Sequence, residues 1–393
     1  MRWNFDEHVN REGTDCIKYD LRKETFGVKD VIPMWVADMD FRTPDFIVSA
    51  LKNRINHEIY GYSFFPSEYH QSIIKWFRER YDWHIEEEWI CFSPGVVPAL
   101  NISTLAFTQQ GDGIIVQPPV YFPFFSAVTA HNRKLLINQL KESNGRWEMN
   151  FESLLRIIDG TTKMILISNP HNPVGRVWSY EELNELAEIC IENNILIISD
   201  EIHCDLVLPG FRHNPLSKLS DRVAERTITY VSPSKTFNLA GLATASVIIP
   251  DPDLRESFKR IVNNLHIGNG NIFGTIASVA AYSRGHEWLS DLLEYIDHNV
   301  DFVMEFCRKM IPEIIPVQPE ATYMIWLDCR KLGMQGKDMQ DFFTNLAGVG
   351  MSEGSTFGRG GEGFMRMNLA TTRQTVVKAM EQIEKAVSSI RKN

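Results

Sequence analysis

The chain has 393 residues, 44% of them hydrophobic and 23% charged, which is an ordinary globular composition with room for two or three domains and a large core. Its 50 acidic residues outnumber its 40 basic ones, and the net charge of -10 disfavours contact with a phosphate backbone, so we expect no nucleic-acid partner. No apolar stretch approaches the length of a membrane span and no signal peptide is recognisable, so we expect a cytoplasmic protein without a membrane partner.

The six cysteines form no recognisable site. They show no C-x-x-C pair or other metal-ligand spacing, and several lie in apolar runs, where a thiol behaves as a small hydrophobic group. We therefore predict reduced cysteines and no metal site. The residues are Cys16, Cys91, Cys190, Cys204, Cys307 and Cys329.

The N-terminal part of the chain predicts an arm followed by helices. Residues up to about Phe41 mix polar and aromatic side chains, which indicates an irregular arm rather than a core helix. Residues 44–80 have helical periodicity, and the sequence Tyr60-Gly61-Tyr62 interrupts it with a turn.

Between Cys91 and Pro250, short apolar runs alternate with amphipathic ones. The apolar runs predict buried strands, and the clearest helix is expected from Tyr180 to Asn193, with Ser179 as its N-cap. Nearly continuous apolar strands separated by helices favour a parallel sheet that is covered on both faces. The predicted strands are 113–116, 163–168, 195–199, 227–231 and 245–249.

The last third of the chain predicts amphipathic helices and a smaller α+β unit. The expected elements are helices 253–263 and 286–310, strand 321–327, helix 337–346, strand 363–368 and helix 373–389. The helix 286–310 is long enough to bridge two domains. We predict three parts: residues 1–45 as an N-terminal arm and part of the small domain, 46–285 as the large domain, and 286–393 as the C-terminal small domain.

Polar residues follow the predicted strands, at the edge of an open parallel sheet where ligands bind. The sequence S-P-G-V-V closes a strand at 93–97, and N-P-H-N-P-V-G follows another strand at 169–175. D-E-I-H at 200–203 and S-P-S-K at 232–235 follow two more. A glycine turn, an asparagine, an aspartate and a lysine are therefore expected at neighbouring strand ends.

This set of residues matches the chemical needs of pyridoxal 5'-phosphate (PLP). The cofactor is an aldehyde that needs a lysine for a Schiff base, and Lys235 can supply it. Its pyridine nitrogen needs a buried carboxylate, and Asp200 is placed for this; Asn172 can donate a hydrogen bond to the ring oxygen. The phosphate needs backbone N–H groups at the start of a helix and hydroxyl groups. Those groups are expected from Gly95, Val96, Val97, Ser232 and Ser234.

Seven segments in order carry a resemblance that extends over nearly the whole chain. They are P-M-W-V-A-D-M-D-F at 33–41, S-P-G-V-V at 93–97, P-P-V-Y at 118–121, N-P-H-N-P-V-G-R-V-W at 169–178, S-D-E-I-H at 199–203, P-S-K-T-F-N-L-A-G-L at 233–242 and G-F-M-R-M-N at 363–368. Together they resemble fold-type I PLP enzymes of the aminotransferase class I/II superfamily. The closer resemblance is to the cystathionine β-lyase (C–S lyase) branch called the MalY/PatB family.

The resemblance implies the fold and the roles of individual residues. The expected fold is α/β and PLP-dependent transferase-like (the aspartate aminotransferase fold), with a mostly parallel seven-stranded sheet in the large domain and a smaller α+β domain. Lys235 matches the Schiff-base lysine, Asp200 the partner of the pyridine nitrogen, and Asn172 the ligand of the ring oxygen. The remaining matches are Tyr121 as the aromatic residue stacked on the ring, Gly95, Val96, Val97, Ser232 and Ser234 as phosphate ligands, and Arg366 as the residue that binds the substrate carboxylate. Trp35 and Asp38 are further candidates for the wall of the substrate pocket.

The resemblance also implies a homodimer with active sites at the interface. In that arrangement Tyr62 enters the neighbouring subunit's site, with Tyr60 as a nearby competitor for this role. The position that is a tyrosine in many aminotransferases is His203 here, as in the lyase branch. No basic residue follows Lys235 where many relatives have a second arginine, so the phosphate ligands must be mainly amides and hydroxyls.

Three functions are compatible with these motifs. The first is α,β-elimination from cystathionine or another cysteine S-conjugate, with Lys235 as general base and Lys235 or Tyr62 as proton donor to the leaving sulfur; the products are a thiol (homocysteine), pyruvate and ammonia. This function would place the chain in amino-acid metabolism, in methionine biosynthesis. The second is aminotransferase activity, which differs in where the proton is returned. The third is a regulatory or binding protein that retains the fold. The 33–41 segment and His203 favour elimination.

Overall fold

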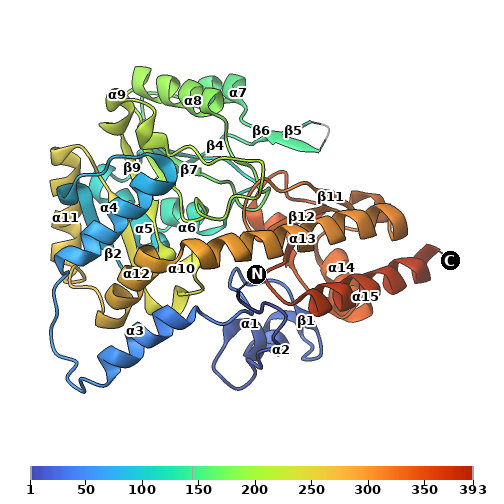
Figure 1. The fold of residues 1–393 in the computed structure, drawn as a ribbon. Coiled ribbons are helices and arrows are strands. Elements are labelled where there is room, and N and C mark those ends of the chain that lie inside the picture. The colour runs from blue at the N-terminus through green and yellow to red at the C-terminus, as the bar shows by residue number, and fades with distance from the viewer. Residues whose placement is uncertain (1, 144, 392–393) are drawn as a thin grey trace.

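The computed structural model describes residues 2–143 and 145–391, and a seven-stranded sheet forms its centre (Figure 1). The strand order is β2-β10-β9-β8-β7-β3-β4. All neighbouring strands are parallel except β10, which is antiparallel to both β2 and β9. The strands are β2 (Ile90–Ser93), β3 (Gly113–Val116), β4 (Lys134–Ile137), β7 (Thr162–Ser168), β8 (Leu196–Asp200), β9 (Thr227–Val231) and β10 (Ala245–Ile248).

Helices cover this sheet because its strands are apolar on both faces. The strands β3, β8, β9 and β10 are buried along their whole length, as expected for strands between two helical layers. The helices of this part are α3 (Asp45–Ile55), α4 (Ser67–Tyr81), α5 (Val96–Phe107), α6 (Pro123–Thr129), α7 (Phe151–Ile157), α8 (Tyr180–Glu192), α9 (Asp221–Ala224), α10 (Pro233–Thr236), α11 (Pro252–Asn264) and α12 (Ile272–Arg284). A capping box between Ser179 and Glu182 begins α8, in agreement with the predicted N-cap.

The C-terminal part contains a second, antiparallel sheet of order β11-β12-β15-β14. Its strands are β11 (Ile315–Val317), β12 (Met324–Asp328), β14 (Ser352–Glu353) and β15 (Phe364–Asn368). The helices here are α13 (His286–Met310), α14 (Gly336–Asp341), which continues as one π-helical turn to Leu346, and α15 (Arg373–Arg391). The long helix α13 runs from the large sheet's side of the molecule to this second sheet (Figure 1).

The N-terminal arm packs against the C-terminal part. Its strand β1 (Ile32–Pro33) pairs in parallel with β13 (Val349–Gly350), so the two ends of the chain share one structural unit. The arm also contains two short helices, α1 (Ile17–Asp20) and α2 (Arg22–Phe26), where we expected irregular structure. A further hairpin consists of β5 (Lys141–Ser143) and β6 (Arg146–Glu148). The division into residues 1–45, 46–285 and 286–393 stays a prediction.

The expected fold class is confirmed, with differences at particular elements. The fold is α/β, and its large sheet has seven strands and is mostly parallel. The predicted helix 286–310 begins and ends as expected. The predicted strand 321–327 begins later, at Met324, because Thr322 adopts a left-handed φ of 73° that interrupts an extended strand. Helix α12 was not predicted from the sequence.

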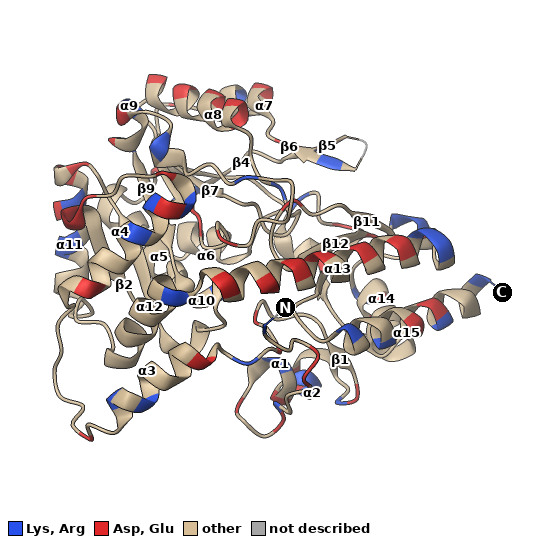
Figure 2. Cartoon of the chain, viewed as in Figure 1, with Lys and Arg blue, Asp and Glu red and all other residues tan. Residues whose placement is uncertain are grey.

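Acidic residues lie along most of α13 and basic residues near its C-terminal end, whereas α15 carries both signs along its length (Figure 2). In the part of the chain that the structure describes, no helix combines the length and the apolar character that crossing a bilayer requires.

Candidate active site

A cavity of about 230 Å³ lies at the carboxyl ends of β7, β8 and β9, where the open-sheet rule places a ligand. Nine of the twelve predicted site residues line it. They are Gly95, Val96, Val97, Tyr121, Asn172, Asp200, His203, Ser234 and Lys235. The other three do not line it: Arg366 is hydrogen-bonded to Asn172, Ser232 is hydrogen-bonded to Ser234, and Tyr62 is exposed on the surface.

Lys235 lies on the short helix α10, directly after β9. Ser232 caps this helix by accepting a hydrogen bond from the Ser234 N–H at 3.1 Å, and Pro233 occupies the first helical position. The Lys235 Nζ donates a hydrogen bond of 2.6 Å to the backbone carbonyl of Ala37. Burial and, second, the positive charge of Arg366 lower the pKa of Lys235 to about 8. The side chain is therefore a partly neutral amine near neutral pH, as a nucleophile or general base requires.

Asp200 ends β8 and is buried, with 6% of its surface exposed. The N–H of Ile202 donates a hydrogen bond of 3.1 Å to its Oδ1. Burial raises the pKa of the Asp200 carboxyl to about 7, although the Ile202 N–H and the Lys235 charge lower it. A cationic N–H of a ligand placed against this carboxylate would reverse that effect, because an adjacent positive charge stabilises the ionised form.

Asn172 and Arg366 form a pair on the side of the cavity that faces the second sheet. Arg366 Nη1 donates to Asn172 Oδ1 at 3.0 Å, which leaves the Asn172 amide N–H groups to act as donors. Arg366 Nη2 donates to the Trp35 carbonyl at 2.9 Å, while its buried Nε has no hydrogen-bond partner among the described residues. Burial lowers the pKa of Arg366 to about 10, so the guanidinium remains charged. The pair can bind an anionic group such as a carboxylate.

His203 and Tyr121 complete the walls of the cavity. Burial and the charges of Lys235 and Arg366 lower the pKa of His203 to about 3, so its imidazole is neutral at physiological pH. His203 Nδ1 is buried and has no hydrogen-bond partner in the part of the chain that the structure describes. Tyr121 precedes α6, and burial raises the pKa of its phenol, which stays protonated.

The opposite end of the cavity is suited to a phosphate group. Gly95 is the N-cap of α5, and the first N–H groups of an α-helix have no partner within the helix. Ser234 and Thr244 add hydroxyl groups to the same lining. The Ser232 hydroxyl donates to the Thr244 carbonyl at 2.7 Å, so its role here is to support Ser234 and the start of α10. Ser232 as a direct phosphate ligand stays a prediction.

Two groups at the site have no signal in the sequence motifs. One is the Ala37 carbonyl, because a backbone oxygen has no sequence signature. The other is Tyr323, which follows Thr322 before β12 and donates from its hydroxyl to the same Ala37 carbonyl at 3.0 Å. Its position depends on long-range packing of the second sheet against the first.

These residues fit PLP. The cavity is lined by a lysine, a buried carboxylate and an amide N–H donor, which are the groups that the aldehyde, the pyridine nitrogen and the ring oxygen require. The start of α5 provides the anion site. Lys235, Asp200 and Asn172 would hold the ring, and Val96, Val97 and Ser234 the phosphate.

Comparisons with known proteins support the same assignment. The profile of the family described as aminotransferase class I and II matches residues 29–383. The chain is 41% identical to cystathionine beta-lyase PatB of Bacillus subtilis over 98% of this chain and 100% of that protein. The crystal structure of cystalysin from Treponema denticola, which contains a PLP cofactor, has a TM-score of 0.96 and 35% identity, and covers 99% of this chain and 100% of that one. The PLP-bound C-S lyase from Staphylococcus hominis has a TM-score of 0.92 and 33% identity over 98% of both chains. The chain belongs to the aminotransferase class I and II family, in the branch of the cystathionine β-lyases that its motifs resemble.

Proposed function

We propose that this chain is a PLP-dependent carbon–sulfur β-lyase that cleaves cystathionine and related cysteine S-conjugates to a thiol, pyruvate and ammonia. The observation that carries the proposal is the convergence of Lys235, Asp200 and Asn172 on one cavity, with Arg366 hydrogen-bonded to Asn172. The 41% identity with a named cystathionine beta-lyase over nearly the full length of both chains supports this reaction over amine transfer.

Each residue has a separate task in binding. Lys235 would hold the cofactor at its aldehyde carbon, Asp200 would keep a proton on the ring nitrogen, and Tyr121 would cover the ring. The amides at the start of α5 and the Ser234 hydroxyl bind the phosphate. When bound, PLP accepts the electron pair that the substrate's Cα–H bond releases. Arg366 binds the substrate's carboxylate as a planar, bidentate donor.

Proton transfer is the task of Lys235. With its amine free of the cofactor, Lys235 would take the proton from the substrate's Cα, and its lowered pKa makes the neutral form available. The Cβ–S bond then breaks, and the sulfur needs a proton to leave as a thiol. Lys235 is placed to return that proton, and Tyr62 of a second subunit is the alternative donor.

The test is a panel of β-substituted amino acids incubated with the PLP-loaded chain in the absence of any keto acid. Release of one pyruvate and one thiol per substrate molecule is the expected result. Amine transfer to an added keto acid, with no pyruvate formed from cystathionine, would instead identify an aminotransferase.

We further propose a homodimer in which Tyr62 serves the neighbouring subunit. The connection between α3 and α4 extends away from the body of the molecule (Figure 1). In this connection Tyr62 is fully exposed, Phe64 is 82% exposed and Ile59 is 65% exposed, which is unusual for large apolar side chains. A second copy that covers this connection would bury these side chains.

A cytoplasmic location is also part of the proposal. All six cysteines are free, and five of them are buried, which is consistent with a reducing compartment. The proposed substrate is a small amino acid, and the net charge of -10 disfavours a nucleic-acid partner.

A further inference from the structure

The segment of residues 34–41, which we call the strap, contributes Ala37 to the lining of the cavity and is hydrogen-bonded by residues of two other parts of the chain. Asn368 of β15 donates to the carbonyls of Val36 at 2.6 Å and Asp38 at 2.7 Å, the two residues that flank Ala37. Asn238 donates to the Met39 carbonyl at 2.9 Å and to that of Phe41 at 3.1 Å. The backbone around Ala37 is therefore fixed by side-chain donors from β15 and from the loop that follows α10.

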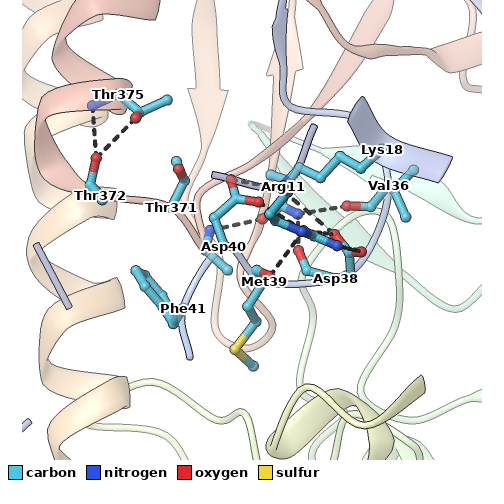
Figure 3. Close-up of polar contacts among 12 residues, drawn as sticks. Arg11, Lys18, Val36, Asp38, Met39, Asp40, Phe41, Thr371, Thr372 and Thr375 are labelled. Atoms are coloured by element: carbon cyan, nitrogen blue, oxygen red, sulfur yellow. Dashed lines mark hydrogen bonds and ion pairs between the residues drawn. The ribbon is translucent and has the colours of Figure 1, made fainter. Parts of the chain in front are cut away.

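A cluster of four charged side chains fixes the strap from the arm side (Figure 3). Arg11 grips Asp38 with two hydrogen bonds, of 2.6 Å from Nη2 and 3.1 Å from Nη1, and its Nη1 also reaches Asp40 at 2.8 Å. Lys18, which is 1% exposed, donates to Asp40 at 3.0 Å. The cluster contains two positive and two negative charges, and the positive charges hold the Asp40 carboxyl at a lowered pKa.

Two donors share the single carbonyl oxygen of Ala37. Lys235 Nζ lies 2.6 Å from this oxygen and the Tyr323 hydroxyl lies 3.0 Å from it. A carbonyl oxygen can accept two hydrogen bonds, but each donor weakens the acceptor for the other. Because an ammonium is a stronger donor than an amine, this oxygen stabilises the protonated form of Lys235.

We propose that Asp38 is a positioning residue. Its hydrogen bonds with Arg11 fix the Ala37 carbonyl, and this carbonyl binds the Lys235 side chain whenever that side chain is free of the cofactor. This inference rests on the proposed role of Lys235. When the amine takes the substrate's Cα proton, one C–H bond breaks and one N–H bond forms. The Ala37 oxygen holds the resulting ammonium until the proton passes to the leaving sulfur. The Tyr323 hydroxyl weakens the hydrogen bond between this oxygen and Lys235, because it donates to the same oxygen.

The charged and titratable groups around Lys235 set the direction of the effect. Asp38 on the strap and Asp200 at the end of β8 favour the ammonium, whereas Arg366 on β15 disfavours it. Of the other neighbours, His203 is neutral and the phenols of Tyr121 and Tyr323 stay protonated because burial raises the pKa of each. Removal of the Asp38 charge should therefore favour the neutral amine, and removal of the Tyr323 hydroxyl should favour the ammonium.

The experiment measures how fast Lys235 in the cofactor-free full chain captures added PLP between pH 6 and pH 9. Borohydride fixes the covalent product, and peptide mass mapping counts only the product on Lys235. Capture needs the neutral amine, so its rate follows the titration of Lys235. The titrations of PLP itself are common to all variants and cancel in the comparison. Thermal unfolding verifies that each variant is folded.

Asp38→Asn is expected to move the midpoint of this pH dependence downward and to make capture at pH 7 about three- to tenfold faster. Tyr323→Phe, which keeps the buried ring, is expected to move the midpoint upward and to slow capture at pH 7. Asp40→Asn is the matched control, because Asp40 also pairs with Arg11, but its charge, unlike that of Asp38, is not among those that shift the pKa of Lys235. Its midpoint should stay with that of the unaltered chain.

Equal shifts in Asp38→Asn and Asp40→Asn would overturn the inference, since the cluster would then act only through the general fold. A Tyr323→Phe midpoint that is unchanged or lower would overturn it independently, even if Asp38→Asn does not fold. If the unaltered chain captures no PLP on Lys235, the proposed function fails instead.

Discussion

Arg366 Nη1 donates a hydrogen bond of 3.0 Å to Asn172 Oδ1, and this bond connects β15 of the second sheet to the loop that follows β7 of the first. It orients the Asn172 amide toward the cavity and leaves the buried Arg366 Nε without a partner among the described residues. A bound carboxylate can satisfy that nitrogen. With Arg366 on the substrate's carboxylate and Asn172 on the ring oxygen, as proposed, this bond would couple the position of the substrate to that of the cofactor.

Arg366→Lys is expected to weaken substrate binding, because an ammonium cannot replace the planar, bidentate guanidinium. We expect kcat/KM for cystathionine to fall roughly a hundredfold, with most of the loss in KM. Steady-state rates of pyruvate release at a series of cystathionine concentrations give both kcat and KM. The control is Arg330→Lys, where the guanidinium pairs with Asp328 outside the cavity. An unchanged KM in Arg366→Lys would show that this arginine does not bind the carboxylate.

Asp200→Asn is expected to have opposite effects on the cofactor-free and the PLP-loaded chain. The pKa of Asp200 is about 7 in the fold and 3.8 in its reference state, so the folded chain binds more protons between these values. Stability therefore falls as pH rises through this window, and at pH 8 the cofactor-free variant should be the more stable by on the order of 2–4 kcal/mol. This advantage should shrink as pH approaches 4.

Loaded with PLP, Asp200→Asn should release pyruvate at least about a hundredfold more slowly, because the ring nitrogen loses its ionised partner. Chemical denaturation at pH 5 and pH 8 measures the stability of the cofactor-free chains, and pyruvate release measures the rate of the PLP-loaded chains. Equal stabilities of the two cofactor-free chains at both pH values would contradict the raised pKa of the carboxyl.

Tyr62→Ala tests the proposed dimer by complementation with Lys235→Ala. If Tyr62 serves the partner's site, a mixed dimer contains one site with both defects and one intact site. An equimolar mixture that has exchanged subunits should therefore recover about a quarter of the unaltered activity. Each variant alone should show far less. Tyr180→Ala, at an exposed tyrosine on α8, is the control that should keep full activity. No recovery after proven exchange would place Tyr62 in its own subunit's site or outside any site.

A substitution of Asp205 tests how the surrounding fold supports α10, the helix that carries Lys235. This buried carboxylate accepts hydrogen bonds from Trp76 at 3.0 Å, Tyr81 at 2.7 Å and Thr236, the neighbour of Lys235, at 3.1 Å, and it pairs with Arg80 at 3.0 Å. Asp205→Asn leaves the guanidinium uncompensated, so the free energy of unfolding should fall by about 3–5 kcal/mol. Asp82→Asn removes an exposed ion pair with Lys218 and should cost under about 1 kcal/mol. Similar losses in the two variants would contradict this account.

The sequence predicted the sheet and the side chains at its edge because both have local signals. Apolar runs identified strands such as 227–231, and the polar residues after them identified Asp200 and Lys235. The motifs around Lys235 also indicated the family, which the comparisons confirm.

Long-range features were not predictable in this way. The antiparallel direction of β10 depends on which strands it pairs with, and an apolar run such as 245–249 does not encode its direction. The Ala37 carbonyl meets both Lys235 and Tyr323 only because the arm and the second sheet fold onto the first. Asp205 likewise gains its partners from α4 and α10, which lie far apart in the chain.

The most direct test of the central claim compares pyruvate release from cystathionine by the unaltered chain and by Lys235→Ala, both supplied with PLP and no keto acid. Because Lys235 is proposed as both the attachment point and the base, its loss should reduce the rate by at least about a thousandfold. Lys218→Ala, which removes a lysine paired with Asp82 outside the cavity, should keep its rate. Sustained pyruvate release by folded Lys235→Ala would contradict the account.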